Sequence, residues 1–176
     1  MTQSKKDPLL TAAKLLTLFL MGVTALVTAF LVVLVPLLLL NQAEMAQEVA
    51  AAGGEFAPAL AVMLLLIVSA AVIVALAFHF FQLLGRVIDT VSQGDPFTTD
   101  NAQRLTRMGW IALIFQIASF PIAAMALYVE QFSPQENLTF DIDFSLTGVL
   151  LAIVLFILAR VFRHGASMRD DLEGTV

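Results

Sequence analysis

The amino-acid sequence predicts an all-α, polytopic membrane protein, a four-transmembrane-helix bundle in which residues 1–176 form a single membrane domain. The first observation is the composition: 60% of the residues are hydrophobic and only 13% are charged, whereas soluble domains contain about 45–50% apolar and about 25% charged residues. The second is that four apolar segments are each long enough to cross a bilayer, which takes roughly 17–25 residues. The third is that two of the three segments between spans contain no lysine or arginine, whereas the N-terminal segment, the segment between the second and third spans and the C-terminal end of the chain do. This asymmetry predicts the orientation of the chain.

Few polar residues interrupt the four expected spans. These spans cover residues 15–40, 57–84, 109–129 and 146–162. Pro36, Pro58 and Pro121 lie within them and are expected to bend their helices, because each proline removes a backbone hydrogen bond. The first span is longer than the hydrophobic core of a signal peptide, so we expect it to stay in the protein.

The positive charges predict that both chain termini are cytoplasmic. All nine lysines and arginines fall before or at the start of the first span, between the second and third spans, or at and after the end of the fourth: Lys5, Lys6, Lys14, Arg86, Arg104, Arg107, Arg160, Arg163 and Arg169. Segments rich in these residues stay on the cytoplasmic side of a membrane. The N-terminus, the segment 85–108 and the tail 163–176 are therefore expected inside the cell, which is an N-in/C-in topology.

The two outer segments, residues 41–56 and 130–145, are acidic and contain no Lys or Arg. In the first, Glu44 and Glu48 lie at helical spacing before a Gly53–Gly54 pair, which favours a short helix. In the second, the sequence NLTFDIDFS alternates apolar and polar residues, a pattern typical of a short strand. We expect this strand to cap the outer end of the bundle. The alternative is an extended loop that dips into the headgroup region.

The segment 85–108 has the features of a helical hairpin outside the membrane. Two apolar stripes at helical spacing, one continuing the second span and one leading into the third, consist of Leu84, Val87, Ile88 and Val91 and of Leu105 and Met108. Gly94 is a helix stop, and Pro96 forces a turn. Thr98 is a good N-cap for the next helix, with Asp100 in its first turn. The two helical extensions are expected to pack on each other, which hides their stripes from water.

This hairpin has two interpretations. The favoured one is structural: the hairpin connects two spans and covers their apolar extensions. The other is that the hairpin and the tail form a docking surface for a cytoplasmic partner. The residues expected to contact such a partner are Asp95, Pro96, Phe97 and Arg104 in the hairpin and Arg163, Asp170 and Asp171 in the tail.

Two stretches of the sequence carry short motifs. In GDPFTTDNAQRLTRMGW, a Gly-x-Pro-Phe-(Ser/Thr) turn precedes a helix with Asn, Arg and Leu, here Gly94, Pro96, Phe97, Thr98, Asn101, Arg104 and Leu105. In LARVFRHGASMRDDLEGTV, a Phe-Arg-x-Gly pattern precedes acidic residues and a terminal Thr-Val, here Phe162, Arg163, Gly165, Thr175 and Val176. In this order, within four spans, the motifs resemble those of the bacterial membrane family called domain of unknown function 2975. The chain departs from many relatives at Thr99, where they have proline, and near Arg160, where they often have an acidic residue.

The resemblance implies a four-span fold in the bacterial inner (cytoplasmic) membrane, and it implies no reaction, because the family has no assigned activity. Members of this family often occur beside genes for small helix-turn-helix regulators. The resemblance therefore also implies such a regulator as a partner, in a regulatory pair linked to the membrane.

Polar residues inside the spans are the other functional candidates, since they are energetically expensive in lipid. His79, Gln82, Gln116 and Arg160 all fall in the cytoplasmic half of their spans, and His79 and Gln82 share a helix face. One hypothesis is a polar pocket between spans two, three and four. The favoured alternative is structural: Gln116 hydrogen-bonds between helices, while Arg160 and His79 extend their polar ends to the interface. Stripes of small residues, such as Gly22, Ala25 and Ala29, favour packing within the chain over a homo-oligomer interface.

The composition excludes several classes of function. The chain has no cysteine, so disulfides, thiolate catalysis and Cys-ligated metal sites are excluded. A net charge of −5 argues against direct nucleic-acid binding. No catalytic residue, metal site or cofactor is predicted, and no enzymatic activity is expected. We expect a non-enzymatic sensor or regulatory partner that acts through the hairpin and tail. The alternative is a small transporter, or a bundle that binds a lipid or small molecule in the polar pocket.

Overall fold

The structure is a computed structural model that describes residues 7–51, 53–130 and 146–173. These residues form five helices and no strand, in the order α1 (Pro8–Leu40), α2 (Gln42–Ala51), α3 (Phe56–Ser92), α4 (Thr99–Glu130) and α5 (Leu146–Glu173). Four of them, α1, α3, α4 and α5, are long and apolar enough to cross a membrane. The predicted all-α fold with four apolar spans is therefore confirmed.

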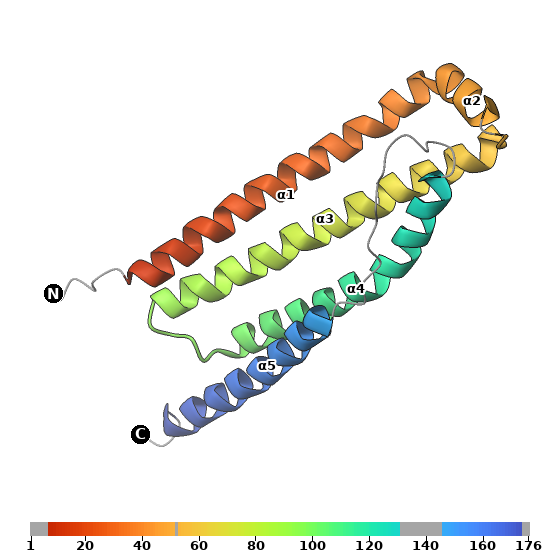
Figure 1. Ribbon diagram of the computed structural model, residues 1–176. Coiled ribbons are helices and arrows are strands. Elements are labelled where there is room, and N and C mark those ends of the chain that lie inside the picture. The colour runs from red at the N-terminus through yellow and green to blue at the C-terminus, as the bar shows by residue number, and fades with distance from the viewer. Residues whose placement is uncertain (1–6, 52, 131–145, 174–176) are drawn as a thin grey trace.

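The long helices pack mainly in chain order. The main contacts join α1 to α3, α3 to α4 and α4 to α5, while α2 packs against α3. Figure 1 shows the start of α1, the α3–α4 turn and the end of α5 at the same end of the molecule, with α2 at the opposite end. This shared end brings together parts of the chain that lie far apart in the sequence.

The helices extend beyond the predicted spans. α3 has 37 residues, about 55 Å at 1.5 Å per residue, whereas the hydrocarbon core of a bilayer is about 30 Å thick. It continues past residue 84 to Ser92, and α4 starts at Thr99 and packs against α3. No secondary structure is predicted for the tail 163–176. In the structure, its residues as far as Glu173 continue α5 as a helix.

The buried core lies in three of the four long helices. Its cluster of buried apolar residues comes from α3, α4 and α5: Leu83, Leu105, Met108, Ile111, Ala112, Ala152, Leu155 and Ala159. In α1 only Thr17 is buried among the described residues, and many of its large apolar side chains are exposed. Large exposed apolar surfaces on a helix of this length are what a lipid-facing helix presents.

Local expectations have mixed outcomes. The short helix expected in residues 41–56 is confirmed as α2, whereas the strand expected within NLTFDIDFS lies outside the described residues. The expectation that Gly22, Ala25 and Ala29 serve packing within the chain is wrong, because all three are exposed. The partly buried face of α1 carries larger residues, including Thr24. Its hydroxyl donates to the Leu20 and Met21 carbonyls, so threonine is tolerated there.

Candidate functional site

The end of the molecule that carries the α3–α4 turn has many polar contacts among the described residues, and we call it the polar junction. It consists of the end of α3 (residues 89–92), the turn (93–98), the start of α4 (99–104) and the last turns of α5 (162–169). α3 ends at Ser92, and Gly94, the second residue of the turn, has a φ of +82°. The Asp95 N–H donates to the Thr90 carbonyl at 3.1 Å, and the Gly94 N–H donates to the Val91 carbonyl at 3.1 Å. This is a Schellman cap, which satisfies carbonyls left free at a helix end.

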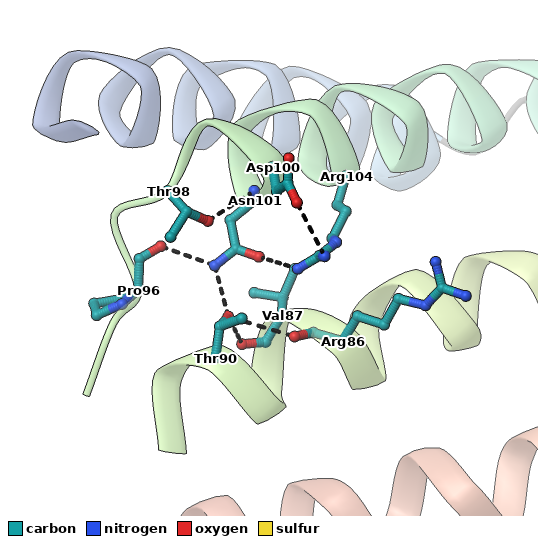
Figure 2. Close-up of polar contacts among 8 residues, drawn as sticks. All are labelled: Arg86, Val87, Thr90, Pro96, Thr98, Asp100, Asn101 and Arg104. Atoms are coloured by element: carbon teal, nitrogen blue, oxygen red, sulfur yellow. Dashed lines mark hydrogen bonds and ion pairs between the residues drawn. The ribbon is translucent and has the colours of Figure 1, made fainter. Parts of the chain in front are cut away.

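Asn101 is the centre of the junction, and it is fully buried. Its Nδ2 donates to Thr90 Oγ1 at 2.6 Å and to the Pro96 carbonyl at 2.8 Å. Its Oδ1 accepts from the Arg104 guanidinium at 2.8 Å. Figure 2 shows this one amide joining the end of α3, the turn and the first turn of α4. A buried polar side chain with all these partners rigidifies a turn, since losing any partner is expensive in free energy.

The start of α4 is capped as the sequence predicted. The Thr98 hydroxyl oxygen accepts from the Asn101 N–H at 3.2 Å, and its carbonyl accepts from the Ala102 N–H at 3.2 Å. Arg104 also lies 3.6 Å from Asp100, one turn earlier on α4. In Figure 2 the side chain of Arg86 points away from this network. Arg86 therefore contributes its backbone carbonyl, which accepts from Thr90, and leaves its charge outside.

The second half of the junction is the contact between the turn and α5. The rings of Phe97 and Phe162 have centroids 5.2 Å apart. A Cβ added at Gly165 would lie only 2.7 Å from Phe97 Cδ1, so the absence of a side chain at this position lets the ring approach α5. Asp95 and Arg169 form an ion pair across the same contact. The two sequence motifs therefore meet in space.

A groove of about 480 Å³ lies beside this contact. It is lined by Gln93, Gly94, Asp95, Pro96, Phe97, Gly165 and Arg169. Its walls come from the turn on one side and from α5 on the other. We call it the turn groove.

The residues expected to contact a partner are in part used within the protein. Asp95 pairs with Arg169, and Arg104 bonds Asn101. Phe97 packs on α5 yet remains 44% exposed. Pro96 lines the turn groove, and its carbonyl accepts from Asn101. The other three, Arg163, Asp170 and Asp171, lie in α5, where Arg163 and Asp171 are exposed and the Asp170 side chain is outside the described part.

Three features of the junction were missed from the sequence. In the sequence Asn101 is only one residue of a motif, and no sequence pattern predicts that its side chain is buried and hydrogen-bonds to three residues. The contact between the two motifs was not foreseen, although an aromatic residue in one and a glycine in the other are a usable signal. The Lys14–Asp89 ion pair, 2.6 Å long, joins α1 to α3 at the same end. It connects residues far apart in the sequence, so only the tertiary structure defines it.

The polar residues within the spans lie in three different surroundings. His79 Nδ1 is 3.3 Å from Gln82 Oε1, and both are half-buried on α3. Gln116 approaches α5, because a Cβ added at Gly148 would lie 2.6 Å from its Oε1. Arg160 is exposed on α5 and lines two grooves there, neither of which is lined by the other three. In the described part of the chain, no three His, Asp or Glu side chains are placed to hold a metal ion.

The fold and the junction define a helical protein with four helices able to cross a membrane and a polar, hydrogen-bonded end. The model of the family described as protein of unknown function (DUF2975) matches residues 43–176, which covers most of the chain, so the protein belongs to this family. The match excludes α1 and includes both motifs. No curated protein and no solved structure matches the chain.

Proposed function

We propose that the protein is a non-enzymatic sensor or regulatory partner in the bacterial inner membrane, and that the turn groove of the polar junction is its cytoplasmic working surface. The N-in/C-in orientation is part of the proposal. Its support is the charge pattern: the described Lys and Arg residues belong to the start of α1, the end of α3, the start of α4 and the second half of α5, which lie toward one end of the molecule (Figure 1). Positive segments of a membrane protein stay on the cytoplasmic side.

The observation that carries the proposal is the contact between the two motifs. Phe97 of the turn packs on Phe162 and over Gly165 of α5. A change in the tilt or depth of α5 within the membrane would therefore move one wall of the turn groove against the other. Such a coupling gives a membrane event a readout at a surface, which is what a sensor needs. A small helix-turn-helix regulator is the partner we propose.

The alternative is a small transporter or a ligand-binding bundle. It is favoured by the His79–Gln82 pair, a half-buried polar contact inside a long apolar helix. It ranks second because Arg160 lines two grooves on α5 to which His79, Gln82 and Gln116 do not contribute.

The test is co-purification from native membranes in mild detergent, followed by native mass spectrometry. The matched variants are Gln93→Arg and Gln103→Arg. Gln93 lines the turn groove, whereas Gln103 is exposed on α4 outside it, and both variants add the same charge. We expect a soluble protein to co-elute with the original chain and with Gln103→Arg, but not with Gln93→Arg. A chain that elutes without a protein partner, or a partner equally retained by both variants, contradicts the proposal.

A further inference from the structure

A second groove, of about 780 Å³, lies where α4 and α5 pack on each other. Its lining includes Thr106 from α4 and Phe156, Arg160, Arg163, His164 and Ser167 from α5. Successive α5 residues of this set are three or four positions apart, except that Arg163 and His164 are adjacent. They therefore form one stripe along the helix. We call this the basic groove.

Polarity changes along the basic groove. At one end Phe156 packs edge-on against Trp110 of α4, with ring centroids 5.5 Å apart, and Trp110 is 58% exposed. Toward the other end lie Arg160, Arg163 and His164. His164 comes eight positions after Phe156, which is about 12 Å along the helix. Exposed Trp beside apolar residues is typical of the interface between hydrocarbon and headgroups. The groove therefore runs from an apolar, membrane-level end to a cationic end.

The cations of the basic groove have no carboxylate partner within the described residues. At the same end of the molecule, Lys14, Arg104 and Arg169 each pair with an aspartate. Arg160 and Arg163 are exposed and form no ion pair with an Asp or Glu among the described residues. No Asp or Glu lines the groove. Two guanidinium groups without an internal counterion attract an anion, and guanidinium binds phosphate oxygens through two parallel hydrogen bonds.

We propose that the basic groove binds an anionic phospholipid. The phosphate lies between Arg160 and Arg163, and the acyl chain lies along Phe156 and Trp110. A basic site between helices at the membrane surface is suited to an anionic headgroup. The apolar end favours a lipid over a soluble anion, because a free phosphate would leave Phe156 and Trp110 without an occupant. This site is separate from the turn groove and is proposed independently of the partner role.

The test uses Trp110, which is the single tryptophan of the chain and packs against Phe156 beside the apolar end of the groove. The full chain is reconstituted in vesicles of phosphatidylcholine and phosphatidylglycerol with matched acyl chains. One of the two lipids carries brominated chains, which quench tryptophan on contact. We expect brominated phosphatidylglycerol to displace phosphatidylcholine beside Trp110 with about a fivefold preference, as roughly one additional Arg–anion contact provides.

Matched variants separate the groove from general surface charge. Arg160→Gln/Arg163→Gln is expected to reduce the preference to about one, while Arg160→Lys/Arg163→Lys retains part of it, since the charge remains. Lys14→Gln/Arg86→Gln removes two charges from α1 and α3 and is expected to leave the preference unchanged. Equal quenching by both lipids in the original chain overturns the proposal. So does an equal loss in both Gln variants, or loss of the preference on adding soluble glycerol phosphate, which would assign the groove to a free anion.

Discussion

α1 and the unit formed by α3, α4 and α5 all consist of helices apolar enough to cross a membrane, but they are packed in different ways. α1 has 33 residues and one buried side chain, and its main contact is with α3. The other three helices share a buried cluster of residues, and the family match begins after α1. Apolarity thus predicts that a helix enters the membrane, but it does not predict whether a given face meets lipid or another helix.

Small residues account for the difference. In α4 and α5 the buried positions are rich in alanine, namely Ala102, Ala112, Ala123, Ala126, Ala152, Ala159 and Ala166. Glycines permit still closer contacts: a Cβ at Gly109 would lie 2.9 Å from the Phe156 ring. In a bilayer, helices associate through close packing and hydrogen bonds, because lipid is as apolar as the side chains. On α1 the stripe of small residues that includes Gly22 is exposed. A Cβ added at Gly22 would have no described neighbour within 4 Å.

The largest effect is expected from Asn101→Leu, which removes the hub of the polar junction. Three hydrogen bonds to Thr90, Pro96 and Arg104 are lost, and we expect the free energy of unfolding to fall by about 3 kcal/mol. The measurement is SDS-induced unfolding in mixed micelles, followed by circular dichroism. Gln103→Leu, on an exposed site of the same helix, should change stability by less than about 0.5 kcal/mol. Equal effects of the two variants would show that the hub does not stabilise the junction.

An intermediate effect is expected from Gly165→Leu, and Gly22→Leu is its matched control in α1. The new side chain at position 165 would collide with the Phe97 ring, so we expect a loss of about 2 kcal/mol in the free energy of unfolding. At position 22 the same change meets open space and improves helix propensity by up to about 1 kcal/mol. The same unfolding assay compares them. Adding Phe97→Ala should restore part of the stability lost at position 165, and no restoration would argue against the ring contact as the cause.

The smallest effect is expected at the ion pair that joins α1 to α3. Lys14 and Asp89 are about half exposed, and exposed pairs contribute roughly 0–1 kcal/mol. Lys14→Gln, Asp89→Asn and the double variant form a cycle that measures the coupling free energy. We expect a coupling below about 1 kcal/mol that decreases as salt is added. A coupling above about 2 kcal/mol would mean that α1 is held as firmly as the other helices, which would remove the difference between the two regions.

Much of the fold and part of the site could be predicted from the sequence. The spans follow from apolar segment length, and the hairpin follows from local signals: Gly94 ends one helix, Pro96 turns the chain and Thr98 caps the next. The short helix α2 also follows from local spacing. These features depend on residues a few positions apart, and backbone hydrogen bonding and steric limits act over that range.

Which helix faces meet, and which residues form the sites, is known from the tertiary structure and not from the sequence. The contact of Phe97 with Gly165, the buried position of Asn101 and the basic groove all depend on how α4 and α5 pack. The periodicity of apolar residues hardly indicates which helix faces pack on each other, because a membrane helix is apolar on every face. The sequence alone therefore predicts four apolar spans, and it predicts that a capped polar turn joins the second span to the third. Close packing of small residues, which acts between distant parts of the chain, determined where that turn meets α5.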